Sequence, residues 1–410
     1  MTTRRNLLII AGGAAAAGGT AALAGCRDRG RAAVAVPDVV LAETRHGLVV
    51  LGGARTHGLG AEAVVSRDGG VVYAVTREGA GGSILVRLDP ADGEPAGRTV
   101  FAGRWVPRVV SGDGRSCALT ATPASARPAA RARTRLLVTA DGRQRRYDLG
   151  GVVEPDAFTQ DGAGLFVLEW LPPQAPDRYR VRLLELASGA VQPLLTRNKV
   201  PVPVGAEEEM RGDGRQAVLS PDRQVLYTLY THQPDHRHTR DLIAGRPGGA
   251  HAFVHVLQLA ERWAYCLDLP HPFGEGPAEG HAVAVSADGH RLAVVDVTSG
   301  SLAYADTAAL TIERVIPVPA ADGAASLALA PDGRRVFVGA GTAVTVLDAG
   351  TDTVTARWPV PDPIRGLALS PDATRLYAGG ADEVVWLDAG SGTLRGRVPV
   401  EGLTALRQAR

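Results

Sequence analysis

The residues richest in metal-binding and acid–base chemistry gather in one short stretch, 232–238, which reads His-Gln-Pro-Asp-His-Arg-His. The imidazoles of this stretch, and two that follow it, belong to His232, His236, His238, His251 and His255. Imidazole is a common metal ligand, and side chains an even number of positions apart on a strand share a face. The surrounding sequence is rich in Pro and Gly, however, and offers no helix to fix the ligand spacing. It therefore favours a solvated loop, with metal binding as the alternative, and predicts no metal and no cofactor.

Two charged stretches offer a different kind of chemistry. The basic stretch contains Arg127, Arg131, Arg133 and Arg135. The acidic stretch contains Glu207, Glu208 and Glu209, with Arg211 shortly after it. Such stretches can dock a partner of opposite charge, although two solvated loops that keep the protein soluble are the alternative. The candidate binding residues are Arg131, Arg133, Glu207, Glu208, Arg211, His232, His236 and His238.

The spacings typical of catalytic motifs are missing from the sequence. It contains no Gly-x-Ser-x-Gly elbow, no phosphate-binding Gly/Lys loop and no His-Glu-x-x-His pair. Cys117 and Cys266 fall in different repeat units, too far apart for a disulfide, and we expect free buried thiols. No catalytic residue is therefore predicted.

The elements that must position these side chains follow from a short phrase that occurs seven times: a small residue, any residue, Asp and usually Gly. Its aspartates are Asp68, Asp113, Asp161, Asp222, Asp288, Asp332 and Asp372. Asp and Gly suit tight turns, because the carboxylate accepts backbone N–H groups and Gly permits positive φ. An Asp that recurs in every unit is structural rather than catalytic, so each copy predicts a hairpin turn between two strands.

The spacing of the phrase predicts the architecture. Its last two copies begin 40 residues apart, at 330 and 370, and the final unit has four strand-like runs, at 366–370, 375–379, 383–388 and 394–400. Four short strands in a repeat of this length are typical of a β-propeller blade. We therefore expect an all-β fold, a β-propeller of four-stranded antiparallel blades.

The number of blades depends on how the ring closes. Seven phrase copies favour seven blades, with Leu48–Leu51 completing the closure. Eight blades are possible if 402–406 forms the first strand of a hybrid blade and Val39–Leu51 its third and fourth strands. Seven is the preferred count.

Beyond these patterns, the sequence resembles known propeller repeats. The run Leu-Ala-Leu-Ser-Pro-Asp at 367–372, followed by Leu-Tyr-Ala-Gly-Gly at 376–380 and Val-Val-Trp-Leu-Asp at 384–388, resembles YVTN repeats and is similar to WD-repeat blades. Three runs, at 227–230, 252–257 and 266–270, resemble the fourth blade of exported propeller lipoproteins from high-GC bacteria. The resemblance implies the fold and carries no activity, since propellers serve as enzymes, scaffolds and binding discs. Some propellers of this class are lactonases, which implies a charged central channel as an alternative site.

Long insertions distinguish the middle units. They lie at 122–134, 171–178, 196–214 and 231–249. In a propeller, loops between second and third strands and loops between blades emerge on one face. We therefore expect a protein or small-ligand partner to bind the loop-rich face of blades two to four.

The N-terminal residues predict export. Residues 3–8, Thr-Arg-Arg-Asn-Leu-Leu, resemble a twin-arginine signal, and Leu23-Ala24-Gly25-Cys26 resembles a lipobox whose Cys26 is lipidated. A transmembrane anchor or cleavage without a lipid are the alternatives. The predicted organisation is a signal peptide at 1–26, a tether at 27–38 and one propeller domain at 39–410. Cys26 would then anchor the protein to the outer face of the cytoplasmic membrane.

Composition narrows the possible partners. The formal net charge is +1, which gives no support for nucleic-acid binding. A closed propeller exposes little sheet edge, so a monomer is expected. The predicted function is a membrane-anchored binding or scaffold module at the cell envelope, and the alternative is a hydrolase or lactonase-like enzyme with its site in the central channel.

Overall fold

The computed structural model describes residues 35–410 except 54, 61, 79, 80, 92, 124, 126 and 213. The predicted signal peptide, Cys26 and most of the predicted tether lie outside the described residues. Among the helices that are described, none has the length and apolar character needed to cross a membrane.

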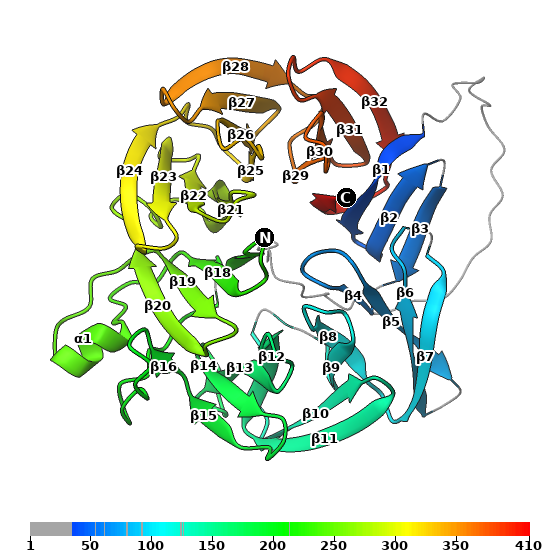
Figure 1. Cartoon of the computed structure of the whole chain (residues 1–410), viewed down its shortest axis with the longest axis vertical. Helices are drawn as coiled ribbons and strands as arrows, with labels where there is room; N and C mark the ends of the chain where they lie inside the picture. The colour runs from blue at the N-terminus through cyan, green and yellow to red at the C-terminus, as the bar shows by residue number, and fades with distance from the viewer. Residues whose placement is uncertain are drawn as a thin grey trace.

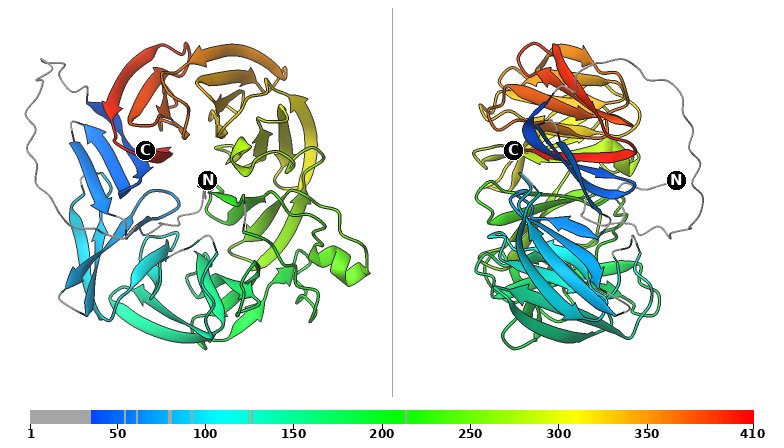
Figure 2. Two further views of the ribbon diagram at one scale, coloured as in Figure 1. Left: turned by 180° about the vertical axis from the view of Figure 1, so that it is seen from behind. Right: turned by 90° about the vertical axis from the view of Figure 1, so that its right-hand side faces the viewer.

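The described chain forms eight twisted β-sheets arranged as blades around a central axis (Figure 1). Viewed from the other face and from the side, the ring is a thick disc (Figure 2). The fold is therefore the predicted β-propeller, all-β with four-stranded antiparallel blades.

The first four blades run in chain order. Blade one contains β4 (Ala63–Val65), β5 (Val72–Glu78), β6 (Gly82–Leu88) and β7 (Pro95–Ala102). Blade two contains β8 (Val106–Val110), β9 (Ser116–Thr120), β10 (Arg133–Ala140) and β11 (Arg143–Gly150). Blade three contains β12 (Val152–Phe158), β13 (Gly164–Leu171), β14 (Arg178–Glu185) and β15 (Val191–Pro193). Blade four contains β17 (Gln216–Leu219), β18 (Val225–Tyr230), β19 (Phe253–Gln258), β20 (Trp263–Asp268) and, at its outer edge, β16 (Leu195–Thr196).

The last four blades complete the ring. Blade five contains β21 (His281–Val285), β22 (Arg291–Asp296), β23 (Ser301–Asp306) and β24 (Thr311–Pro317). Blade six contains β25 (Ser326–Leu329), β26 (Arg335–Ala340), β27 (Ala343–Asp348) and β28 (Thr353–Pro359). Blade seven contains β29 (Leu367–Leu369), β30 (Arg375–Gly379), β31 (Glu383–Asp388) and β32 (Leu394–Pro399). Blade eight contains β33 (Leu403–Ala409), β1 (Val36–Thr44), β2 (Gly47–Gly53) and β3 (Arg55–Gly60), and the described helices are α1 (Thr239–Ala244) and the 3-10 turn η1 (Ala278–Gly280).

The ring has eight blades, the alternative count, and not the preferred seven. The C-terminal β33 pairs antiparallel with β1, so the two ends of the chain build a blade of their own. Val39–Leu51 falls in the second and third strands of this blade, because β3 follows as the fourth strand. β3 has no apolar run that would predict it, because its side chains alternate between exposed and half-buried. β1 also begins at Val36, inside the segment expected to be a tether.

The repeated phrase forms the expected hairpin turns. In blade seven, Ser370 Oγ donates to Asp372 Oδ1 at 2.6 Å, and the Thr374 amide donates to the same oxygen at 3.1 Å. The Arg375 amide donates to Ser370 Oγ at 3.0 Å, so the hydroxyl links both ends of the turn. The structural role predicted for the repeated Asp is therefore confirmed in this turn.

Aromatic side chains fill the junction between blades three and four. Trp170, Tyr179, Tyr230 and Phe253 are buried in one cluster, and Tyr179 Oη lies 2.7 Å from Tyr230 Oη. Burying a large apolar side chain contributes about 1.5–3 kcal/mol, so such clusters stabilise the contact between neighbouring blades. This rigid junction supports the insertions that build the candidate site.

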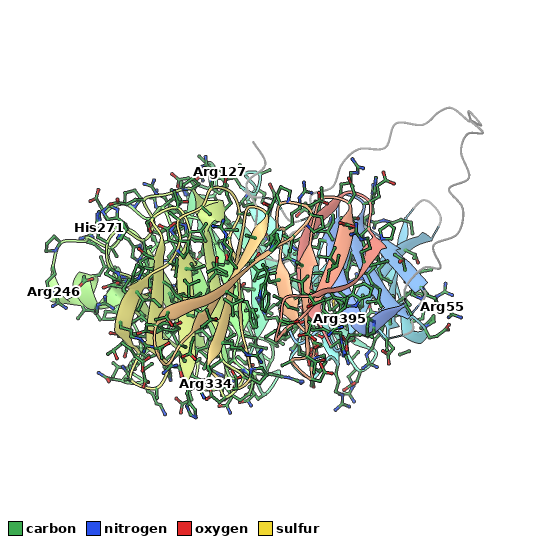
Figure 3. The ribbon with its side chains drawn as sticks, turned by 90° about the horizontal axis from the view of Figure 1, so that it is seen from above. Arg55, Arg127, Arg246, His271, Arg334 and Arg395 are labelled. Atoms are coloured by element: carbon green, nitrogen blue, oxygen red, sulfur yellow. The ribbon has the colours of Figure 1, made fainter. Side chains whose placement is uncertain are left out.

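The turns and the insertion of blade two lie on opposite faces of the disc. Seen edge-on, Arg127 of the 122–134 insertion and Arg334 of a repeated turn point to opposite sides (Figure 3). Arg246, which follows α1, lies instead at the rim of the disc (Figure 3). The 231–249 insertion of blade four therefore reaches the edge of the ring.

Candidate functional site

A pocket of about 590 Å³, here called the edge pocket, lies at the outer side of blade four. Its walls come from β14, β16, α1, β20 and the 197–210 segment that connects blades three and four. Figure 1 shows α1 and β16 outside the β20 strand. Its apolar lining includes Val181, Leu194, Val202, Met210, Ile243 and Ala264. Its polar lining includes the side chains of Glu208, His238, His255 and Cys266.

Two of these side chains are placed by strand register. His255 of β19 lies directly opposite Cys266 of β20, and Phe253 lies opposite Asp268. Alternate residues of a strand share a face, so these four side chains project from one side of the blade. The ordinary geometry of an antiparallel pair thus brings a thiol and an imidazole to the floor of the pocket, with the carboxylate of Asp268 on the same side of the blade.

Glu208 is held in the pocket by its neighbours in the chain. Met210 and Tyr179 exchange two backbone hydrogen bonds, of 2.9 and 2.8 Å, which fix the segment against blade three. Glu207 binds Arg180 at 2.9 Å and Arg182 at 2.8 Å. With Glu207 fixed to β14, the carboxylate of Glu208 turns to the other side, toward the pocket floor.

His236 and His238 reach the floor from the 231–249 insertion. The ring of His236 stacks on Phe253 with centroids 4.5 Å apart, and the ring of His238 meets the same phenyl edge-on at 4.8 Å. His238 is also the residue that precedes α1. Packing against one buried phenyl therefore fixes the orientation of both imidazoles.

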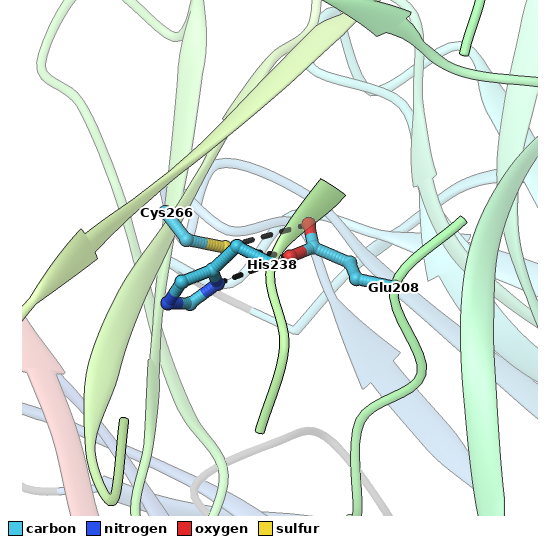
Figure 4. Close-up of side chains that lie close together, drawn as sticks. All are labelled: Glu208, His238 and Cys266. Atoms are coloured by element: carbon cyan, nitrogen blue, oxygen red, sulfur yellow. Dashed lines mark hydrogen bonds and ion pairs between the residues drawn. The ribbon is translucent and has the colours of Figure 1, made fainter. Parts of the chain in front are cut away.

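The carboxylate of Glu208 lies at the centre of a group of side chains, here called the Glu208 cluster. Its other members are His236, His238, His255 and Cys266. Glu208 Oε2 is 3.2 Å from His238 Nδ1 and 3.3 Å from Cys266 Sγ (Figure 4). The Nε2 atoms of His236 and His255 lie 3.5 and 3.8 Å from the carboxylate. The side chain of Glu208 is 11% exposed, and those of the three histidines are 3% exposed.

These contacts shift the ionisation of the cluster. Burial opposes the charge of Glu208, but its contacts with His236 and His238 and the charge of His255 hold its pKa well below the ordinary value. Burial also opposes the charge of His238, but hydrogen bonds with Asp268 and Glu208 raise its pKa to about 8. Burial and the neighbouring Glu208 raise the pKa of Cys266 well above that of a free thiol. At pH 7 the cluster therefore holds a carboxylate at Glu208, an imidazolium at His238 and a neutral thiol at Cys266.

A second carboxylate orients the ring of His238 from behind. His238 Nε2 hydrogen-bonds Asp268 Oδ1, and Arg240 pairs with Asp268 Oδ2. The side chain of Asp268 is 48% exposed, which places this pair at the outer rim. The bond to Asp268 leaves Nδ1 as the nitrogen of His238 that faces the pocket floor.

The structure brings three of the predicted candidate residues together: Glu208, His236 and His238. Glu207 instead binds blade three, and the backbone amide of Arg211 donates to Gln233 Oε1 at 2.9 Å. His232 has positive φ and places Nδ1 2.9 Å from Thr231 Oγ1, outside the cluster.

The basic candidates of blade two form no part of this site. Arg131 donates to Thr134 Oγ1 and Arg133 pairs with Asp148, both within blade two. The expectation of a single binding face spanning blades two to four therefore does not describe the Glu208 cluster, which belongs to blades three and four.

Sequence reasoning missed Cys266, Asp268 and Arg240 as partners of the cluster. It predicted Cys266 only as a free buried thiol, and both described cysteines are indeed free and buried. Strand alternation is the sequence signal that could have linked Asp268 to Cys266, because the two residues are two positions apart in β20 and share a face.

The central channel contains a second cavity, of about 490 Å³, whose charged lining residues are Arg67, Glu279, Arg365 and Arg407. Beside it, Asp156 is buried and lies 2.7 Å from Arg215 and 3.6 Å from Arg67. Burial opposes the charge of Asp156, but Arg215 and Arg67 keep its pKa below the ordinary value. Charged side chains therefore converge on the axis, as the enzyme alternative requires, and these three form ion pairs between blades one, three and four.

Fold and site together define a β-propeller with a polar-floored pocket at the edge of one blade. No family model and no curated protein matches the sequence. Among solved structures, apo AztD from Citrobacter koseri has a TM-score of 0.52 at 12% identity, over 91% of this chain and 97% of that chain. A eukaryotic initiation factor has a TM-score of 0.52 at 12% identity, over 92% of this chain and 90% of that chain. At such identities these similarities show the propeller fold alone.

Proposed function

We propose that this chain is an exported, lipid-anchored propeller that binds a protein partner at the cell envelope through the edge pocket. The leader-like Arg4-Arg5 and the lipobox-like Cys26 support the cellular location. Lipidation of Cys26 would hold the disc at the outer face of the cytoplasmic membrane, where a partner could reach its rim.

The observation that carries this proposal is a group of exposed apolar side chains around the edge pocket. Val200 and Ile243 line the pocket and are 57% and 53% exposed, and Val204, which follows the pocket-lining Pro203 in the chain, is 102% exposed. The other large exposed hydrophobics of the described chain are dispersed over the outer strands of four different blades: Val100, Val315, Val354 and Leu394. Grouped exposed apolar residues with polar neighbours are typical of protein-interaction sites.

Site-specific photo-crosslinking in native membranes tests this proposal. A photoreactive residue at Ile243 or Val204 is expected to give a discrete crosslinked partner. The matched control is the same residue at Val315 or Val354, which are 42% and 45% exposed on other blades. A crosslink from the edge-pocket positions alone supports the proposal. Equal crosslinks from the control positions, or none from Ile243 and Val204, contradict it.

The charged channel supports a second candidate, a hydrolase or lactonase-like enzyme. Its supporting observation is the set of channel arginines together with the buried Asp156, whose pKa is lowered by Arg215. A screen of lactones and esters tests it, with Arg67→Ala in the channel and Arg133→Ala on the outside of blade two as matched variants. Hydrolysis by the Arg133 variant but not by the Arg67 variant is the expected result. No turnover by the native protein contradicts this candidate.

A further inference from the structure

We propose that Glu208, His238 and Cys266 bind a divalent transition-metal ion, and that zinc is the ion their chemistry fits. This inference goes beyond the proposed function, because it requires no protein partner. The donors come from three separate segments: the connection between blades three and four, the 231–249 insertion and β20. The prediction of no metal considered only the spacing within the His-rich stretch, whereas these ligands meet through the fold.

The donor set selects the class of metal. It combines a thiol sulfur, an imidazole nitrogen and a carboxylate oxygen, whose ligand atoms all lie within 4.8 Å of one another. Zinc accepts these three donor types together, whereas calcium and magnesium prefer oxygen donors alone. Alkaline-earth ions are therefore poor candidates for this site.

The distances from Glu208 to the other two donor atoms suit tetrahedral coordination. Ordinary zinc bond lengths place nitrogen and oxygen ligands about 3.3 Å apart and sulfur and oxygen ligands about 3.6 Å apart. Here Nδ1 of His238 is 3.2 Å from Glu208, and Sγ of Cys266 is 3.3 and 3.4 Å from the two carboxylate oxygens (Figure 4). Metal could therefore replace the present hydrogen bonds with small shifts of the side chains.

The ring of His238 already has the support typical of a metal ligand. Metal-binding histidines usually donate their other ring nitrogen to a carboxylate, which fixes the ring and increases its basicity. His238 does so through Nε2 to Asp268, which Arg240 holds in turn. This arrangement leaves Nδ1 for the ion, beside Glu208 and Cys266.

The burial of the cluster provides an independent indication of a ligand. His236 is 6% exposed and, among the described residues, its Nε2 has no hydrogen-bond partner although it faces Glu208 at 3.5 Å. Buried ring nitrogens normally find a partner. Metal binding would release the proton that the Cys266 thiol now donates to Glu208 at 3.3 Å, and the ion would offset the repulsion between the carboxylate and the resulting thiolate.

The edge pocket supplies an entry path and an open coordination position. All three ligands line this pocket, so one side of the ion would face its interior. A zinc site with three protein ligands and an open position can take water or a ligand group in the fourth place. The site could thus hold an exchangeable ion or a partner's donor atom.

Metal binding to the purified full-length protein tests the inference directly. After the protein has been stripped with a chelator, equimolar Co²⁺ is expected to give a thiolate-to-metal charge-transfer band, which Zn²⁺ should abolish by displacement. Cys266→Ala should lose this band, whereas Cys117→Ala, at the other buried thiol, should keep it. The absence of a band in the native protein, or its persistence in Cys266→Ala, would overturn the inference.

A second variant keeps the test decisive if Cys266→Ala fails to fold. Removing the outer partner of a metal-bound histidine typically lowers metal affinity about 10–100-fold, and Asp268→Asn should do so here. Asp148→Asn, at an exposed Arg–Asp pair of blade two, is the matched control and should leave zinc affinity unchanged. Equal zinc affinities for both variants in a competition titration would contradict the inference. Photo-crosslinking from Ile243 reports on the partner separately, so each proposal can fail without the other.

Discussion

Asp38 accepts a hydrogen bond from the hydroxyl of Tyr377 at 2.6 Å, although 339 positions separate the two residues. Arg375 donates to the same carboxylate at 2.8 Å. Asp38 belongs to β1 of blade eight, and both partners belong to β30 of blade seven. The contact thus joins β1 of blade eight to the neighbouring blade seven and strengthens the closure of the ring.

Truncation of Leu403 provides a test of this closure in solution. This residue is fully buried in β33, whose pairing with β1 completes blade eight. Leu403→Ala should lower the free energy of unfolding by about 2–5 kcal/mol, the usual cost of such a truncation in a core. Leu394→Ala, on the outer strand of blade seven, is 43% exposed and should change it by less than about 0.5 kcal/mol. Denaturant unfolding of both variants measures the difference, and equal effects would contradict the eight-blade closure.

The repeated phrase made the propeller predictable, because its turn chemistry acts within a few residues of sequence. The blade count was harder, since it depends on pairing between residues near opposite ends of the chain. β33 follows the last copy of the phrase and was expected only in the eight-blade alternative, and β3 alternates exposed with half-buried residues, so no repeated turn marks either strand. Closure is a tertiary property that no single segment encodes.

Asp156 provides a test of the buried ion pairs beside the channel. Asp156→Asn leaves Arg215 buried without its charged partner, and breaking such a pair costs about 3–5 kcal/mol. Asp148→Asn removes an exposed pair, with Arg133, and should cost less than about 1 kcal/mol. Denaturant unfolding at pH 7 compares the two variants.

The same substitution should show a defined pH dependence. The folded-state pKa of Asp156 lies below the ordinary value of 3.8. The stabilisation of the folded state by the ionised carboxylate is therefore complete above about pH 3.8. This stabilisation is lost as the pH falls through the folded-state pKa. The stability gap between the native protein and Asp156→Asn should therefore narrow only below about pH 4. If this difference in the free energy of unfolding already disappears between pH 7 and 5, its pH dependence arises from a group other than Asp156.

The candidate site was predictable only in part. Glu208, His236 and His238 stood out because Glu and His residues cluster in two short stretches, but the sequence could not show that two separate insertions meet. Cys266 and Asp268 were hidden in a strand, where the register against β19 decides which face they share. Glu207 and Glu208 look alike in sequence, and the ion pairs of Glu207 with the arginines of β14 leave Glu208 as the one that joins the cluster.

Glu207 should act as the anchor of the 197–210 segment. Glu207→Gln removes its ion pairs with Arg180 and Arg182, so the segment should open more often and be cleaved faster by protease. Glu209→Gln is the matched control, because Glu209 is 39% exposed and binds Arg178, which is itself 46% exposed. Limited proteolysis with mapping of the cleavage sites measures the effect. Equal cleavage in both variants would show that Glu207 does not anchor this segment.

Ala330 permits a test in which stability should increase. Of the seven turn phrases, the copy in blade six alone begins with Ala rather than Ser or Thr. Ala330 is 1% exposed, and Ser370 at the equivalent place in blade seven is 2% exposed, so the site can hold a hydroxyl. In Ala330→Ser, the new Oγ should donate to Asp332 and accept the Arg335 amide, as Ser370 does with Asp372 and Arg375.

The expected gain is about 0.5–1.5 kcal/mol in the free energy of unfolding, the net contribution of a typical hydrogen bond. Ser370→Ala is the reciprocal variant and should lose at least as much, because Asp372 and the Arg375 amide then lose a partner. Urea unfolding of both variants and of the native protein measures the two changes. Destabilisation by Ala330→Ser would show that the hydroxyl strains the blade-six turn, and the shared turn chemistry would then not extend to that blade.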